Sequence, residues 1–201
     1  MKHLWLAIVL VSVAAAQDRE AKVRSDRDKI EAEGFWIYND VEKGFAEAGK
    51  TGKPLLVVFR CIPCTACVQI DSRVAERDPK IRALLEQYVC VRVITANGMD
   101  LSLFQFDYDQ SWAAFLLNAD RTIYGRYGTR SHQTREHEDI SIEGFGAALE
   151  GGLALHKEFP KNREALAAKR GPAPATRAPE EFASLKGKYT SALDYQGKVV
   201  P

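Results

Sequence analysis

The chain has 201 residues, a hydrophobic content of 46% and a formal net charge of +1. This hydrophobic content excludes a chain that is disordered throughout, and the length allows one ordinary domain with appendages. A nearly neutral chain has no strong positive electrostatic field that would attract nucleic acid or an anionic membrane, so we expect no nucleic-acid partner.

The first sixteen residues have the pattern of a secretory signal peptide. Lys2 and His3 form a short basic start, residues 4–13 are an apolar run, and residues 14–16 (Ala-Ala-Ala) form an A-x-A cleavage signal. The run is shorter than the roughly 20 apolar residues that a membrane anchor needs. We therefore predict export to the periplasm or the extracellular space, with no stable membrane insertion after cleavage. Exported cysteines tend to form disulfides or to exchange them.

Residues 17–34 are strongly charged and are predicted to be a mobile or helical lead-in. A short helix is predicted for residues 40–50, with one apolar face at Val41, Phe45 and Ala48. Residues 55–59 (LLVVF) are apolar throughout, which suits a central parallel strand that is covered on both faces.

A cysteine-rich segment then leads into a predicted helix at residues 66–77. Asp78 as the cap and Pro79 at the first helical position start another helix. Its apolar residues recur at helical spacing, at Ile81, Leu84, Leu85 and Tyr88. Residues 89–94 (VCVRVI) alternate as in a strand.

The last predicted elements are a hairpin and a helix. Residues 113–117 and 122–127 read as two strands joined by the turn Asn-Ala-Asp-Arg. Ser141 can cap a helix that runs through His156 and stops before Pro160. We expect His156 to pack or to face solvent, not to react. No Gly-rich phosphate loop and no Ser/His/Asp arrangement is evident, so nothing favours a hydrolase or a nucleotide-binding protein.

Three of the four cysteines stand at even spacing in RCIPCTAC, residues 60–67. They form two overlapping C-x-x-C pairs, Cys61 with Cys64 and Cys64 with Cys67. Arg60, which precedes them, is read as a surface arginine that either favours a thiolate electrostatically or has no special role.

The order of these elements and the run AEAGKTGKPLLVVFRCIPCTAC (residues 46–67) resemble the thioredoxin-like superfamily, in particular exported or envelope domains with a GKP, apolar strand, C-x-x-C pattern. The resemblance implies an α/β thioredoxin fold, a central mixed sheet with helices on both faces. Together with the residue patterns at the two ends, it divides the chain into a signal peptide (1–16), a charged lead-in (17–34), a thioredoxin-like domain (35–158), and a C-terminal helix, Pro/Ala-rich linker and tail (159–201).

The resemblance also implies which pair is redox-active. In such domains the first redox cysteine follows the GKP proline by about ten residues, and counting from Pro54 leads to Cys64. Cys64, at a helix N-terminus, would be the nucleophile with a lowered pKa, and Cys67 would resolve the mixed disulfide. The implied function is an exported thiol-disulfide oxidoreductase with no cofactor. Its partners would be protein thiols and disulfides, with a membrane or envelope redox protein as one option.

The chain departs from the family pattern at three positions: Pro63 replaces an aromatic residue, Val58 a buried aspartate, and Trp112 the proline of a cis bond. A cis bond before a non-proline residue is costly, so the bond before Trp112 is expected to be trans. Trp112 itself is either a core aromatic or a cover for the site.

Two alternative functions stay open. Cys61, Cys64 and Cys67 could together bind a soft metal as Cu, Zn or an Fe–S cluster, with Cys90, His132 and His137 as candidates for a fourth ligand. We expect Cys90 to be a buried apolar cysteine and the two histidines to be solvated. If no metal is bound, Cys61 is either a spare thiol or a shuttle partner that exchanges a disulfide with Cys64. The other alternative is a catalytically inactive thioredoxin-fold interaction domain.

Overall fold

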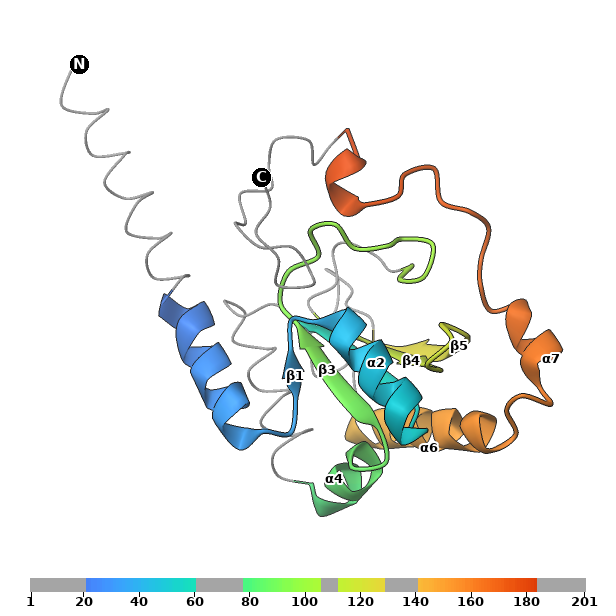
Figure 1. Ribbon diagram of the computed structural model, residues 1–201, viewed down its shortest axis with the longest axis horizontal. Coiled ribbons are helices and arrows are strands. Elements are labelled where there is room, and N and C mark those ends of the chain that lie inside the picture. The colour runs from blue at the N-terminus through green and yellow to red at the C-terminus, as the bar shows by residue number, and fades with distance from the viewer. Residues whose placement is uncertain (1–20, 61–77, 106–111, 129–140, 184–201) are drawn as a thin grey trace.

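The computed structural model describes residues 21–60, 78–105, 112–128 and 141–183 (Figure 1). Its core is a five-stranded sheet with strand order β1-β3-β2-β4-β5. The strands are β1 (Ile37–Tyr38), β2 (Leu55–Arg60), β3 (Val89–Val93), β4 (Trp112–Leu117) and β5 (Ile123–Tyr127). β3 pairs in parallel with β1 and β2, whereas β4 pairs antiparallel with β2 and β5. The predicted mixed sheet is confirmed.

The central strands are buried on both faces. Every residue of β2 and every residue of β3 is buried. Helices cover the two faces of the sheet, with α2 in front of it and α6 behind it in the view of Figure 1. The α/β class with helices on both faces is therefore confirmed.

The first face is covered by α2 (Val41–Thr51), which buries the three predicted apolar residues and Gly44. The Asp40 side chain caps this helix by accepting a hydrogen bond from the amide of Lys43 at 2.9 Å. Gly52 ends it at a φ of 70°, a conformation that glycine adopts without strain. The rest of this face is covered by the segment after β3, which buries Met99, Leu101, Leu103 and Phe104.

The second face is covered by α4 (Pro79–Leu85), α6 (Ile142–Lys157) and α7 (Arg163–Ala167). The predicted caps are both present: the Asp78 side chain accepts from the amides of Lys80 and Ile81, and the Ser141 hydroxyl accepts from the amide of Gly144. α4 is shorter than the apolar spacing predicted, because the chain turns after Leu85 to enter β3.

The charged lead-in is helical over the part of it that the structure describes, residues 21–33. Ile30 of this helix is 1% exposed and belongs to the hydrophobic cluster on the second face. The helix therefore packs on the sheet as part of the folded unit, so of the two predicted states, mobile or helical, the helical one is observed here.

Residues 171–183 return to the first face. The backbone carbonyl of Arg177 accepts a hydrogen bond from the amide of Leu101 at 3.0 Å, and the Glu180 side chain accepts from the amide of Gly98 at 2.8 Å. Pro179, in the 3-10 turn η1 (Pro179–Glu181), is buried, and Phe182 packs against the first-face cluster. Figure 1 shows η1 beside the segment that follows β3. Among the described helices, none is long and apolar enough to cross a membrane.

Candidate functional site

The predicted redox cysteines follow the last residue of the central strand. β2 ends at Arg60, and the parallel strands β1, β3 and β2 direct their carboxyl ends to the same edge of the sheet. Cys61, Cys64 and Cys67 come next in the sequence, and they lie outside the described residues, as do His132 and His137. Their predicted roles as redox pair, metal ligands or solvated groups therefore stay predictions.

Arg60 is a buried residue, which corrects the expectation of a surface arginine. It is only 7% exposed. Its Nη1 lies 2.8 Å from Oδ1 of Asp26, in the helix at residues 21–33. The reason is that alternate residues of β2 face the second side of the sheet, and the N-terminal helix covers the end of the strand there. A cation in this place requires a carboxylate beside it.

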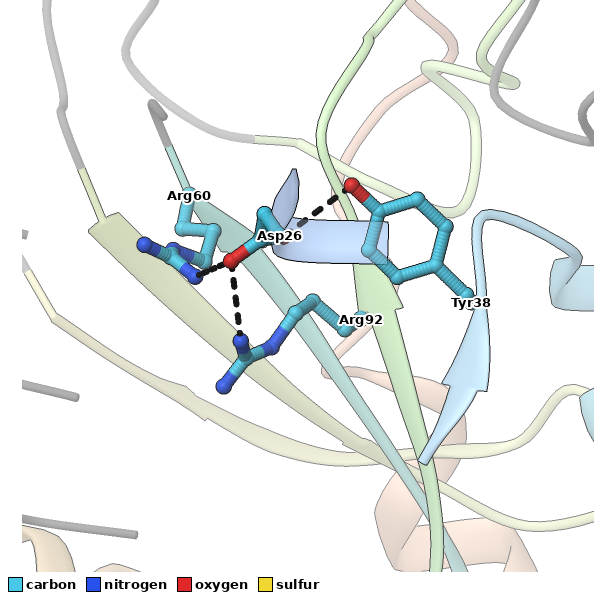
Figure 2. Close-up of polar contacts among 4 residues, drawn as sticks. All are labelled: Asp26, Tyr38, Arg60 and Arg92. Carbon is cyan, nitrogen blue, oxygen red and sulfur yellow. Dashed lines mark hydrogen bonds and ion pairs between the residues drawn. The ribbon is translucent and has the colours of Figure 1, made fainter. Parts of the chain in front are cut away.

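Arg92 and Tyr38 complete a cluster around the same carboxylate (Figure 2). Arg92, on β3, is buried, and its Nη1 lies 3.5 Å from the Asp26 Oδ1. The Tyr38 hydroxyl, from β1, donates to the Asp26 Oδ2 at 3.0 Å. In the sheet Arg92 is paired with Tyr38 on one side and with Val58 on the other, which brings these side chains to one end of the sheet. We call Asp26, Tyr38, Arg60 and Arg92 the Asp26 cluster.

The electrostatics of the cluster follow from this arrangement. Burial, and then the negative charge of Asp26, raise the pKa of the Tyr38 hydroxyl, which therefore stays protonated and continues to donate. The Arg92 guanidinium lies 5.2 Å from the ring centroid of Trp36, within the range of a cation–π contact. Two guanidinium groups, those of Arg60 and Arg92, thus share the Asp26 carboxylate.

Asp26, Tyr38 and Arg92 are not among the residues predicted from the sequence. One signal does point toward them: Arg60 and Arg92 each stand in an otherwise apolar strand of the sheet. A cation in a strand that is covered on both faces implies an acidic partner. The partner itself could not be identified by spacing, because Asp26 is 34 positions from Arg60 and 66 from Arg92.

Cys90 is a buried, free cysteine, as predicted. It is 3% exposed, and its Sγ lies 3.4 Å from the carbonyl oxygen of Leu85. Burial raises the pKa of the Cys90 thiol well above its ordinary value, which keeps the group neutral. A neutral buried thiol is neither a nucleophile nor a metal ligand. Cys90 is therefore part of the core between β3 and α4.

Val58 and Trp112 also lie in the core of the second face. Val58 is 4% exposed and occupies the position where the family resemblance puts a buried aspartate. Trp112 is 2% exposed and packs edge-on against Phe145 and Tyr127, at centroid distances of 5.3 and 6.1 Å. Of its two predicted roles, the core aromatic is the one observed. The bond to Ser111 lies outside the described residues.

His156 packs, as predicted, and does so at the opposite end of β2. Its Nδ1 is 2.9 Å from the Tyr124 hydroxyl, and its Nε2 is 2.9 Å from the carbonyl oxygen of Gly52. A groove of about 470 Å³ lies beside it, lined also by Lys53 and Gln87. Because Pro54 at this groove precedes β2 whereas the cysteines follow β2, the groove is separate from the predicted redox site. Among the described residues, no three His, Cys, Asp or Glu side chains come together as a metal site.

A sequence profile of a thioredoxin-like family matches residues 36–119. Comparison with curated proteins gives no match. Among solved structures, the chain is similar to a disulfide isomerase from Xylella fastidiosa Temecula1, with 22% identity over 55% of this chain and 86% of that one, and a TM-score of 0.39. Residues 36–119 thus match a thioredoxin-like family, and the five-stranded mixed sheet with helices on its two faces is consistent with a thioredoxin-like α/β fold.

Proposed function

We propose that the protein is an exported thiol-disulfide oxidoreductase that exchanges disulfides with other proteins through Cys64 and Cys67. The observation that supports this most is the position of the cysteine segment, which starts directly after β2, the central strand of a thioredoxin-like domain. The carboxyl ends of parallel strands are the usual place for functional loops in α/β sheets. The buried, neutral Cys90 is excluded as the reacting thiol.

The reaction has two thiol-exchange steps. The Cys64 thiolate attacks one sulfur of a partner disulfide, forming a mixed disulfide and releasing the other partner sulfur as a thiolate that takes up a proton. The Cys67 thiolate then attacks the Cys64 sulfur, which releases the second partner thiol and leaves a Cys64–Cys67 disulfide. The partner is reduced and the domain is oxidised, and the reverse sequence oxidises a partner dithiol.

The proposed location is the periplasm or the extracellular space, and it rests on the signal-peptide pattern of residues 1–16. In an oxidising compartment, protein disulfides and thiols are available as substrates. The partners would be such proteins, and a membrane or envelope redox protein is the kind of partner that would restore the oxidation state of the cysteine pair.

A second candidate function is supported by the third sulfur of the cluster. Cys61, Cys64 and Cys67 in C-x-x-C-x-x-C spacing could supply three thiolates to Cu(I), Zn(II) or an Fe–S cluster. Metal analysis of protein purified without oxygen separates the two candidates. Stoichiometric zinc, copper or iron would favour the metal site, and its absence favours thiol exchange.

Trapping of partners tests the assigned roles. Cys67→Ser should accumulate mixed disulfides through Cys64, because the resolving thiol is missing, whereas Cys64→Ser should accumulate few. Cys61→Ser and Cys90→Ala are matched controls, each lacking one sulfur but keeping the proposed pair, and should trap no more than the unaltered chain. Equal trapping by the Cys64 and Cys67 variants would show that the assigned roles are wrong. Trapping by neither variant would also contradict them, and it is the result expected of a catalytically inactive interaction domain.

A further inference from the structure

Residues 171–183 lie antiparallel to residues 97–105, the segment that follows β3 (Figure 1). Three hydrogen bonds join the two segments, and the donor in each belongs to residues 97–105. They run from the Gly98 amide to the Glu180 Oε1 at 2.8 Å, from the Leu101 amide to the Arg177 carbonyl oxygen at 3.0 Å, and from the Gln105 Nε2 to the Pro172 carbonyl oxygen at 3.0 Å. Since the number rises along one segment as it falls along the other, the two chains pair in opposite directions. We call residues 171–183 the strap.

The strap enters these bonds through acceptors, which are two backbone carbonyls and one carboxylate. Its composition suits this role, because Pro172, Pro174 and Pro179 have no N–H group to donate. Proline-rich segments also favour an extended chain whose carbonyls stay accessible. Pro179 is buried, and Phe182 packs against the first-face cluster. The surface of residues 97–105 therefore recognises an extended chain that carries prolines, a carboxylate and an aromatic ring.

The strap is held more weakly than the elements of the sheet. Ala173, Ala175 and Arg177 are exposed. The Oγ1 of Thr176 and the Oε2 of Glu180 are buried with no hydrogen-bond partner within the described part of the chain, and burial of such atoms opposes the seating of the strap. Segments with little buried surface open at a lower free energy than the whole domain. The strap is thus able to leave while the sheet stays folded.

We infer that the surface of residues 97–105 is a docking surface for an extended, proline-containing segment of a partner protein, and that the strap occupies it until such a segment displaces the strap. Proline-rich segments are recognised by this kind of contact in other protein complexes. A second copy of the chain is a poorer occupant, since its strap is identical in sequence but lacks the advantage of covalent attachment. The inference concerns the first face of the sheet and does not depend on the proposed thiol exchange.

Hydrogen exchange of the reduced full chain, resolved by residue with NMR, tests whether the strap leaves by itself. The Gly98 and Leu101 amides both donate to the strap, so one opening should expose both. We expect equal protection factors for these two amides, at least about tenfold below those of the β3 amides. Protection as high as that of β3 would mean that the strap leaves only when the domain unfolds, and would overturn the inference.

A fluorescein-labelled peptide with the sequence of residues 171–183 tests whether another segment can take the place of the strap. It should bind weakly to the unaltered full chain, because the attached strap competes at an effective concentration on the order of millimolar. It should bind about tenfold more tightly to the full chain with Glu180→Ala and Phe182→Ala, whose own strap is weakened. A peptide with these two changes should bind to neither chain.

Arg177→Ala in the full chain is the matched control. It removes an exposed side chain of the strap but keeps the carbonyl oxygen that Leu101 contacts, so the peptide should bind this variant as weakly as the unaltered chain. Circular dichroism verifies the fold of each variant. If the double variant does not fold, Phe182→Ala alone replaces it, and hydrogen exchange of the unaltered chain decides without any variant.

Equal binding of the peptide to the unaltered chain and to the double variant, or equal binding of the two peptides, would overturn the inference. Analytical ultracentrifugation of the unaltered chain identifies the occupant. A monomer at all concentrations agrees with a partner protein. A dimer that the double variant abolishes would assign the surface to a second copy of the chain and overturn its assignment to a partner.

Discussion

The Oδ1 of Asp26 and the Nη1 of Arg60 lie 2.8 Å apart, although 34 positions separate the two residues in the sequence. This contact joins the helix at residues 21–33 to the end of the central strand, one residue before the cysteine segment. It means that the folded unit extends beyond residues 36–119, the part of the chain that matches the thioredoxin-like profile.

Asp26→Ala should lower the free energy of unfolding by about 3 kcal/mol, because it leaves two buried guanidinium groups without their shared carboxylate. Urea unfolding of the reduced chain, followed by circular dichroism, measures the change. Asp28→Ala on the same helix is exposed and should stay within about 0.5 kcal/mol of the unaltered chain. Equal effects of the two substitutions would show that the Asp26 contacts contribute little.

Substitution by alanine at Gly151 and at Gly152 of α6 should change the free energy of unfolding in opposite directions. A Cβ at Gly151 meets no atom within 4 Å, so Gly151→Ala should raise the free energy of unfolding by about 0.5–1 kcal/mol through helix propensity. A Cβ at Gly152 would lie 2.8 Å from the Leu116 Cδ2 and would also press on the Tyr88 hydroxyl.

That hydroxyl is held by a 2.6 Å hydrogen bond to the carbonyl oxygen of Leu149 and cannot move aside freely. Gly152→Ala should therefore lower the free energy of unfolding by about 1–3 kcal/mol. Thermal unfolding of the two variants in parallel tests this, and a stabilising effect at both positions would mean that α6 is not packed closely against β4.

Cys90 should make the protein less stable in alkaline solution. Its thiol pKa is raised in the folded chain, whereas the unfolded chain ionises this thiol near pH 8.5. The folded state thus binds more protons above that pH, and stability falls as the pH rises, by at most about 1.4 kcal/mol per pH unit for this group. Below about pH 8 the contribution is fully present.

Cys90→Ala should remove this part of the pH dependence. Urea unfolding under reducing conditions between pH 7 and 10 compares the variant with the unaltered chain, and the two slopes should differ only at the alkaline end. Parallel curves over the whole range would contradict a buried, neutral Cys90.

Residues 171–183 should stabilise the segment that follows β3. A chain that ends at residue 170 loses the hydrogen bond between Leu101 and Arg177, the buried Pro179 and the packing of Phe182. We expect a loss of about 2–4 kcal/mol and faster proteolysis within residues 94–105, because apolar side chains there become exposed. A chain that ends at residue 183 is the control, and cleavage at the same rate in both chains would contradict the prediction.

Most helices and strands of the domain could be predicted from local sequence. The Asp78 and Ser141 caps, the apolar run of β2 and the turn before β5 each depend on a few neighbouring residues, so they can be recognised from the local sequence. The length of α4 could not be predicted, since Leu84 and Tyr88 keep helical spacing although the helix ends between them. The sheet that the chain joins sets the residue at which α4 ends and β3 begins, and the helical spacing of the apolar residues does not.

Hydrophobicity and order along the chain are enough to predict the class of the fold, the burial of Cys90 and the place of the cysteines after the central strand. The burial of Arg60 could be learned from the folded structure alone, and so could the contacts that Arg60, Arg92 and Tyr38 make with the Asp26 carboxylate. The local sequence of an arginine next to a cysteine is the same whether the arginine side chain faces water or the core. What distinguishes the two cases is a carboxylate contributed by a distant helix, and the energy of burying a cation depends on that partner being in place.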